Sequence, residues 1–381
     1  MKIIIITLYK GSFPFVDELL DQLNKKGVDV CVFDMVDMHT VRLVNGERIF
    51  DFHTKSTIFR KLCGIRFLGT ILRSLFYKWY LNHIDFSCDH INIHYALPYY
   101  SQFIGLFKRK SKSTSVVIWG SDFNRVNNNK RNRMKHLFQN CDNILIPNTQ
   151  LAAAFTKFYG VGIGEKIKSV GFGIGKLDLI KELSHAVEVN QIKFDLNIPI
   201  NKLVLTIGYN GLQAQQHLLI LEALSDLSKE LKNRIMIIIP FGYGGDVGYK
   251  NELLNRIKEL GIDYHLHDSF ISDVDVAKIR ICTDIAINAQ ITDGSSASLQ
   301  EHIYSGNVLM VGDWLQYNHF SDVGVKFLIF SKENLSEMLI AVLNDFEYYK
   351  DNAKNNKDLI YNMSSWNARI NQWIELFQNK L

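Results

Sequence analysis

The chain has 381 residues, of which 47% are hydrophobic and 22% are charged. That length exceeds what one hydrophobic core usually supports, so two domains are expected, and the composition excludes a disordered chain. A net charge of +4 is too small for a dedicated nucleic-acid binder, but it is uneven: residues 1–180 hold 25 Lys and Arg against 14 Asp and Glu, and the remainder hold 18 against 25.

The first half alternates short apolar runs with amphipathic segments. Strands are predicted at 2–8, 28–35, 89–95, 114–119 and 143–147. A helix is predicted between the first two strands, ending near Gly27. The N-terminal apolar run is too short for a signal peptide, and no run approaches the ~18 residues of a spanning helix. The five widely spaced cysteines suit a reducing compartment.

A basic, apolar segment follows the second strand. From Thr54 to Ile84 there are six basic residues and no acidic one. Eight apolar residues recur there at helical spacing: Leu62, Ile65, Leu68, Ile71, Leu72, Leu75, Phe76 and Trp79. One interpretation is a core-packed helix with a solvated basic face. The other, which the lack of acids favours, is an amphipathic helix on an anionic membrane, peripheral to its cytoplasmic face.

The second half repeats the alternation more regularly. Strands are predicted at 203–207, 235–240, 264–267, 285–288 and 308–311, and helices at 213–231, 249–260, 273–282 and 295–304. Apolar strands alternating with helices are typical of parallel sheets covered on both faces. We therefore predict an α/β chain with two Rossmann-like, doubly wound domains facing across a cleft. These are residues 1–175 and 176–355, followed by a helix at 356–381 that packs back toward the first domain.

The segment from Gln290 to Gly306 is the most informative. Small or acidic residues lead into its helix: Asp293, Gly294, Ser295, Ser296 and Ser298. Glu301 lies about two turns along the helix. Free N–H groups and the helix dipole make such a helix start suitable for a phosphate. The structural alternative is that Asp293 caps the helix and Glu301 is solvated.

An acidic residue followed by seven residues and Glu resembles the E-x7-E motif of GT-B glycosyltransferases, especially retaining enzymes of bacterial surface polysaccharides. The resemblance implies that Asp293 contacts the donor sugar and Glu301 the nucleotide ribose; Asp is one methylene shorter than the usual Glu. The stretches VVIWGSDF, LTIGYNGLQAQQHLLILEAL and IIIPFGYGGDVGYKNELLNRIKELG resemble the N-acetylfucosamine (4-acetamido-4,6-dideoxygalactose) transferases of enterobacterial common antigen. Those GT-B enzymes use an undecaprenyl-linked acceptor.

The turn GYNGLQAQQH departs from the retaining relatives, which usually place Arg and Lys there to clamp the diphosphate. Asn210, Gln213 and His217 remain as neutral donors. Gly208 and Gly211 allow close backbone approach, or simply form a tight turn. Neutral hydrogen bonds are weaker than charge-assisted ones, so the helix start must carry more of the phosphate binding.

The first half offers two candidate bases, His94 and Asp122, each at the end of a predicted strand. An inverting transferase needs a base for the acceptor hydroxyl, and Asp122 is the preferred candidate. The alternatives are that Asp122 caps a helix beginning at Phe123 and that His94 is a hydrogen-bonded core residue. Gly11 and Ser12 resemble the glycine loop that approaches the donor phosphate in this fold; an ordinary turn also explains them.

The prediction is a glycosyltransferase that moves a sugar from a nucleotide-diphosphate donor to a lipid-linked or oligosaccharide acceptor in bacterial surface polysaccharide or glycan assembly. The alternatives are a UDP-sugar 2-epimerase on the same fold and a non-catalytic partner that binds sugar nucleotides or glycans. Asp273 and Asp275 mimic a metal-binding D-x-D pair, but Ser272 before them indicates ordinary helix capping. No metal, cofactor or nucleic-acid partner is predicted.

Overall fold

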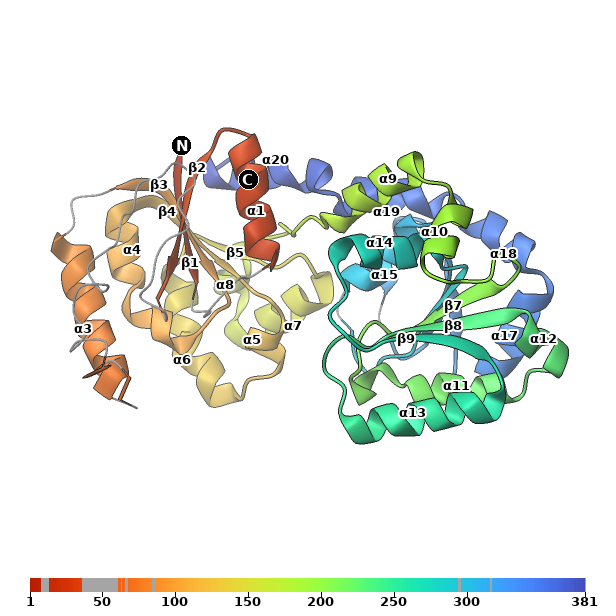
Figure 1. Ribbon diagram of the computed structural model, residues 1–381. Coiled ribbons are helices and arrows are strands. Elements are labelled where there is room, and N and C mark those ends of the chain that lie inside the picture. Colours follow the sequence, from red (N-terminus) through yellow and green to blue (C-terminus); the bar gives the residue numbers. More distant parts are fainter. Residues whose placement is uncertain are drawn as a thin grey trace. The chain divides into compact units, whose positions relative to one another are not determined.

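The computed structural model describes residues 1–7, 14–35, 61–62, 64–65, 68–83, 87–293, 296–315 and 317–380. It divides into two compact units, unit 1 (Met1–Gly173 and Arg369–Leu381) and unit 2 (Ile174–Ala368). Each unit is built around its own six-stranded parallel sheet (Figure 1). The predicted α/β architecture with two Rossmann-like domains is therefore confirmed.

The sheet of unit 1 has the order β2-β1-β3-β4-β5-β6. Its strands are β1 (Lys2–Thr7), β2 (Asp29–Asp34), β3 (Cys88–His94), β4 (Ser111–Val117), β5 (Asn143–Leu145) and β6 (Ile167–Lys168). Helices on one face are α3 (Leu68–His83), α4 (Ile104–Lys110), α6 (Asn128–Asn140), α7 (Thr149–Tyr159) and α8 (Val161–Gly164), and α1 (Pro14–Lys25) and α20 (Trp366–Phe377) lie on the other. Two short elements, η2 (Pro98–Gln102) and α5 (Ser121–Asn124), complete the unit.

Strand β3 shows how the last helix completes unit 1. Its isoleucines face the core beneath α3 and α4, so the alternate residues point to the opposite face of the sheet. On that face the His90 ring lies 4.9 Å from the ring of Phe377, and the His94 ring stacks on Trp373 at 6.2 Å. The indole of Trp373 also donates to the carbonyl of Gly171 at 2.9 Å. Helix α20 thus covers the polar face of β3.

The sheet of unit 2 has the order β12-β11-β10-β7-β8-β9. Its strands are β7 (Leu203–Ile207), β8 (Ile235–Pro240), β9 (Asp263–His267), β10 (Ile285–Asn288), β11 (Val308–Gly312) and β12 (Leu328–Phe330). One face is covered by α11 (His217–Ser225), α12 (Lys229–Asn233), α13 (Val247–Leu260), α17 (Leu335–Asn344) and α18 (Phe346–Ala353). The other is covered by α9 (Lys176–Ala186), α10 (Val189–Asp195), α14 (Asp273–Cys282), α15 (Ala297–Tyr304) and α19 (Asn356–Ser364); the short η3 (Gln213–Gln215) and α16 (Asn318–Ser321) lie in loops.

One helix prediction is wrong, because residues 213–231 form η3, α11 and α12 rather than one helix. Gln216 adopts a left-handed conformation with φ of 55°, and its side-chain amide donates to the carbonyl of Ala289. A second break precedes Ser228, whose Oγ caps α12 by accepting from the N–H of Leu231 at 3.2 Å. Apolar periodicity continues through both breaks, so it could not reveal them.

Candidate functional site

The strand order of unit 2 creates a topological switch between β7 and β10. From β7 the chain proceeds outward to β8 and β9, and then it returns to form β10 on the other side of β7. In open parallel sheets, ligands bind at the carboxyl ends of the strands at such a switch. Strand β10 leads from there through residues 289–296 into α15. The segment that the sequence singled out therefore lies where the topology predicts a ligand.

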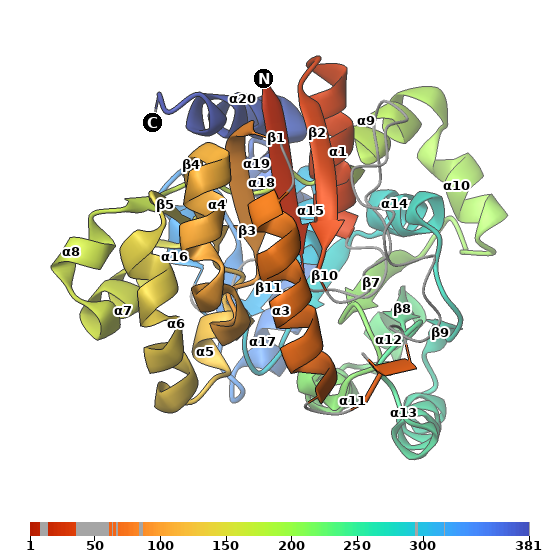
Figure 2. The ribbon, with the colours of Figure 1, turned by 90° about the vertical axis from the view of Figure 1, so that its left-hand side faces the viewer.

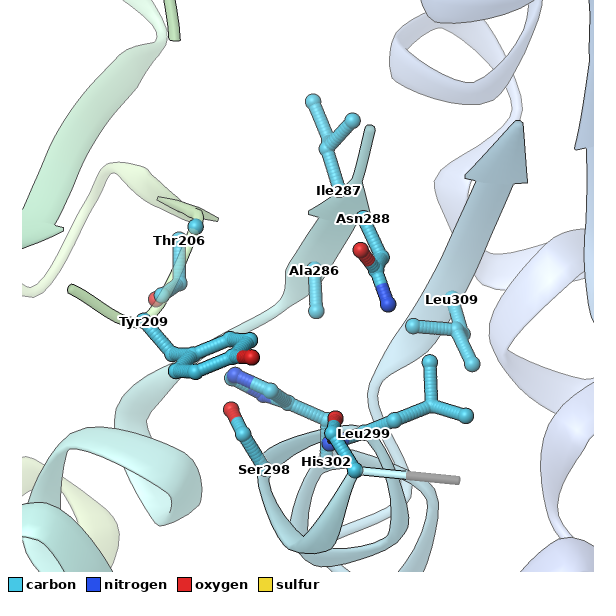
Figure 3. Close-up of a pocket in the computed structure, with 11 residues that line it drawn as sticks. Thr206, Tyr209, Ala286, Ile287, Asn288, Ser298, Leu299, His302 and Leu309 are labelled. Atoms are coloured by element: carbon cyan, nitrogen blue, oxygen red, sulfur yellow. The ribbon is translucent and has the colours of Figure 1, made fainter. Parts of the chain in front are cut away.

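A small pocket occupies this place. Thr206 and Tyr209 line it from the end of β7, Asn288 from the end of β10, and Ser298 and His302 from α15. Figure 3 shows Tyr209, Ser298 and His302 pointing toward a common space. That space is about 20 Å³, enough for about one water molecule. A nucleotide cannot lie inside a space of that size.

The start of α15 lines part of this pocket. Ser296 is the N-cap residue, and its Oγ accepts from the N–H of Leu299 at 3.1 Å. Asp293 Oδ2 accepts from the N–H of Ser296 at 3.2 Å, but Ser296 itself is the N-cap residue, so the alternative that Asp293 caps the helix is wrong. Within the described part of the chain, the N–H groups of Ala297 and Ser298 have no acceptor. These two amides point out of the helix start and suit an anion.

Asp293 has a second partner, Tyr317. The Tyr317 hydroxyl donates to Asp293 Oδ2 and accepts from the side-chain amide of Asn288 at 2.9 Å. Burial, with the Asp293 carboxylate beside it, raises the pKa of Tyr317 far above its usual range, so the phenol stays protonated. The Asp293 carboxylate is thereby oriented by the helix start and, through Tyr317, by the end of β10. Both contacts use Oδ2, so Oδ1 is the other oxygen of this carboxylate that can accept a hydrogen bond.

Glu301 is not solvated, and that structural alternative is wrong. Its side chain is 3% exposed, and its Oε2 accepts from Arg280 Nε at 3.0 Å. Arg280 lies on α14, is buried as well, and donates a second bond to Ser298 Oγ at 2.9 Å. Beside them, His302 Nδ1 lies 2.6 Å from Asn307 Oδ1, and burial lowers the pKa of His302 well below its usual value. Glu301 therefore belongs to a buried polar network under the helix start.

The turn after β7 holds another neutral histidine. His217 is buried, its Nδ1 lies 3.1 Å from the hydroxyl of Tyr249, and burial lowers its pKa to about 4. Its Nε2 has no hydrogen-bond partner among the residues that the structure describes. A Cβ atom on Gly208, whose φ is +65°, would lie 2.6 Å from that Nε2. Gly208 is thus required both by its backbone conformation and by the histidine ring.

The other candidates in this turn have structural contacts. Asn210 Oδ1 accepts from the N–H of Leu212 at 2.9 Å and so shapes the turn. A Cβ atom on Gly211 would lie 2.8 Å from backbone atoms of Gly245, so this glycine permits packing between two loops. Gln213 is exposed at the start of η3. Of the predicted neutral donors, only His217 combines burial with an unbonded nitrogen.

In unit 1, Asp122 joins the ends of two neighbouring strands. It is 1% exposed, and its carboxylate accepts from the N–H groups of Ala96 at 2.9 Å and Trp119 at 3.0 Å. Burial raises its pKa to about 6. Asp122 does not cap a helix beginning at Phe123, because α5 begins at Ser121, with Gly120 as the N-cap residue. The carboxylate instead connects the segments that follow β3 and β4.

His94, the last residue of β3, is enclosed by aromatic rings. Trp119, Phe172 and Trp373 lie with ring centroids 5.7 to 6.2 Å from its own. Burial lowers the pKa of His94 to about 3, so the ring is neutral. Neither ring nitrogen has a hydrogen-bond partner within the described ranges, so the expected hydrogen bonds of a core histidine are absent. The side chain is 2% exposed, and both ring nitrogens are buried.

Sequence reasoning missed Arg280, Tyr209 and Tyr317. Nothing in the helical pattern of α14 marks Arg280 as buried, because its partners lie on α15 and are brought to it by the fold. Gly11, Ser12, Gly294 and Ser295 lie outside the described residues. The predicted cap at Ser272 is confirmed, since its Oγ accepts from the N–H of Asp275 at 3.1 Å. Over the described ranges, no cluster of three His, Cys, Asp or Glu residues could hold a metal ion.

No protein-family model and no curated protein matches the sequence. Solved structures do match. HepE of Anabaena in complex with UDP is 12% identical over 100% of both chains, with a TM-score of 0.69. Sucrose-phosphate synthase of Thermosynechococcus elongatus is 13% identical over 99% of this chain and 98% of that one, with a TM-score of 0.68. A glycosyltransferase of Rickettsia africae is 12% identical over 100% and 98%, with a TM-score of 0.68. At these identities the likeness shows the fold, and the chain has the GT-B architecture of two Rossmann-like domains.

Proposed function

We propose that this protein is a glycosyltransferase that moves a sugar from a nucleotide-diphosphate donor to a lipid-linked or oligosaccharide acceptor, in the assembly of bacterial surface polysaccharide or another glycan. The observation that carries the proposal is the meeting of the β7/β10 switch, the pocket and the open start of α15 in unit 2. The structurally similar HepE of Anabaena has been solved with UDP and with UDP-glucose, which supports a nucleotide-sugar donor here.

In the proposed complex, the donor diphosphate accepts hydrogen bonds from the N–H groups of Ala297 and Ser298. Gly294 and Ser295, which precede them, would add small-residue backbone to the same site. His217 Nε2 would contribute a neutral donor beneath Gly208 once the phosphate reaches that turn. Helix-terminal amides stabilise the negative charge that grows on the departing diphosphate, and they need no reorganisation during the reaction.

The two acids have different roles in the proposal. Asp293, oriented by Tyr317 and Ser296, would accept from hydroxyls of the donor sugar. Glu301 would accept from the ribose through the carboxylate oxygen that Arg280 does not occupy. Arg280 neutralises the buried Glu301 charge and holds Ser298, so it is a positioning residue.

Unit 1 is proposed to bind the acceptor at the cytoplasmic face of a membrane. For an inverting reaction, Asp122 is the base candidate, because burial brings its pKa to about 6, near the range in which a carboxylate exchanges protons readily. Its two oxygens are already bonded to backbone N–H groups, so it would act only after those contacts rearrange. His94 is the second candidate and has two unbonded ring nitrogens.

A second candidate function is a sugar-nucleotide or glycan-binding partner without activity. The observation that favours it is that neither place offers a cation to the diphosphate. The turn after β7 contains no Lys or Arg, and Arg280 is already bonded to Glu301 and Ser298. A transferase with this site relies on neutral donors, whereas a binding protein needs no further stabilisation of the leaving group. Turnover of a nucleotide sugar separates these two functions, and donor conversion without an acceptor would indicate an epimerase.

Proline at the first helical position tests the phosphate site with little disturbance. Proline fits that position, since Ser296 is already extended (φ −66°, ψ 143°) before it, so Ala297→Pro removes one N–H donor and keeps the helix. We expect UDP to bind roughly tenfold to a hundredfold more weakly in calorimetric titration, the value of a hydrogen bond to a charged group. The matched control is Val247→Pro at the start of α13, which follows the extended Asp246. Equal UDP affinity in both variants would remove the proposed phosphate site.

A further inference from the structure

Helix α3 carries an inward apolar face and, beside it, a row of exposed apolar side chains. Its buried residues include Tyr77 and Leu81, and Leu72, Phe76 and Tyr80 pack partly against the same core. The Tyr77 hydroxyl donates to the carbonyl of Met35 at 3.2 Å, which ties this face to the end of β2. These contacts hold α3 on unit 1, so two of the eight apolar residues that the sequence singled out, Leu72 and Phe76, face inward.

The second face points outward. Leu68, Ile71, Leu75 and Trp79 are 43, 57, 59 and 51% exposed, and their spacing of three or four residues places them in one row along the helix. Figure 2 shows α3 on the outside of unit 1, beside α4. Large apolar side chains scattered singly are normal on a surface, whereas these four are neighbours on one helix, which is the arrangement found at interaction sites.

The charges around this row are positive. Lys78 lies three residues after Leu75 and so borders the row, and Arg109 of α4 donates to Asn82, one turn beyond Trp79, at 3.1 Å. In the described ranges, neither Lys78 nor Arg109 forms an ion pair with an acid, whereas Lys108 and Lys112 are paired with Asp142 and Asp89. The sequence from Thr54 to Ile84 adds no acid. An apolar row bordered by unneutralised cations complements an anionic lipid surface.

We propose that the outward row Leu68, Ile71, Leu75 and Trp79 of α3 inserts into the apolar boundary of an anionic membrane, while Lys78 and Arg109 contact its headgroups. The helix lies in the membrane interface and does not cross it; over the described ranges, no helix is long and apolar enough to span a bilayer. This proposal deepens the membrane location in the proposed function, but it requires no donor binding and no catalysis.

Vesicle co-sedimentation of the full chain tests the proposal. Wild-type protein should bind mixed phosphatidylglycerol and phosphatidylcholine vesicles, and high salt should release it. Its affinity for pure phosphatidylcholine vesicles should be lower by about tenfold or more. The double variant Leu75→Ser/Trp79→Ser and the double variant Lys78→Glu/Arg109→Glu should each lose about tenfold or more in binding. Because both variants alter exposed or half-exposed side chains of α3 and α4, unit 1 should remain folded.

The controls make matched changes in unit 2. Val247→Ser/Phe270→Ser removes two side chains that are at least as exposed, and Lys229→Glu/Lys258→Glu reverses two exposed charges. Both should bind vesicles like wild type. Equal loss in the α3 and control variants, or no binding by wild-type protein, overturns the proposal.

Two other occupants give distinct results that would also overturn it. If a second copy of the chain covers the row, light scattering shows a wild-type dimer and a monomeric Leu75→Ser/Trp79→Ser variant. If residues 36–60 cover it, that variant unfolds several degrees lower and wild-type protein ignores vesicles. UDP titration without vesicles is run on wild-type protein and on every variant. If wild-type protein does not bind UDP, the proposed donor site is wrong, and the lipid-binding result is unaffected.

Discussion

The buried pair of Arg280 and Glu301 should have a large and strongly non-additive effect on stability. Both side chains are at most 5% exposed, and their atoms lie 3.0 Å apart. Coulomb's law at an effective dielectric constant of ~20 gives about 5 kcal/mol of attraction for unit charges at roughly that distance. Removing one partner leaves a buried charge uncompensated, so Arg280→Met and Glu301→Leu should each cost about 3–5 kcal/mol.

The double variant Arg280→Met/Glu301→Leu leaves no buried charge. We expect its loss in the free energy of unfolding to be no larger than that of either single variant. The coupling energy between the two residues is then about as large as the loss in one single variant. Native-state hydrogen exchange of the amides of β10 measures the free energy of unfolding of unit 2 without assuming that both units unfold together. Additive losses, or single losses below about 1 kcal/mol, would refute the argument that the pair is desolvated.

This result also decides how Glu301 is tested as a ribose contact. Glu301→Ala would mix lost binding with lost stability, because Arg280 would remain charged and buried. Glu301→Gln also leaves the Arg280 charge without a counter-ion, but it keeps an oxygen acceptor for Arg280 Nε, so it should lose less stability than Glu301→Ala and is the better variant for UDP titration. Ser298→Ala, which removes the other acceptor of Arg280, is the matched control for the network.

Three further predictions follow from single residues. Tyr317→Phe should destabilise unit 2 by about 1–3 kcal/mol, seen in β10 hydrogen exchange, because Asn288 and Asp293 each lose a buried partner; an unchanged value contradicts the contact. Burial raises the pKa of Asp122 from 3.8 to about 6, so the folded state holds that proton more tightly than the unfolded chain does. The stability of unit 1 should therefore fall by up to about 3 kcal/mol as pH rises from ~4 through ~6. Urea unfolding of Asp122→Asn should lack this pH dependence. Since burial lowers the pKa of His94 from 6.5 to about 3, its contribution to stability should be lost as pH falls from 6.5 toward 3; thermal unfolding of His94→Phe should show a weaker acid decline, and an identical decline would place the charge elsewhere.

Local periodicity was sufficient for most of the fold. The strands β7, β8 and β10 and the helix α14 have the predicted bounds, because the strands are short apolar runs and Ser272 caps the start of α14. The short edge strands β6 and β12 were missed, because two or three residues carry no periodic signal. The parallel sheets followed from the alternation of strands and helices, which permits few other arrangements.

The chemical state of the candidate residues was not readable from spacing. Asp293 and Glu301 are eight positions apart, yet one is bonded to a phenol and a helix start and the other to a buried guanidinium. His94 and His217 have the same intrinsic chemistry as any histidine, and desolvation alone keeps them neutral. Most of these differences depend on residues that are distant along the chain, such as Arg280, 21 positions from Glu301, and Trp373, 279 positions from His94.

The amino-acid order alone was thus enough to place a helix start rich in small residues after a buried strand, because capping, turn and periodicity rules act over a few residues. The tertiary structure decided which carboxylates are paired, which histidine rings are desolvated and which apolar side chains of α3 remain exposed. Desolvation and ion pairing depend on neighbours that only the packed chain brings together, and for that reason no local pattern predicts them.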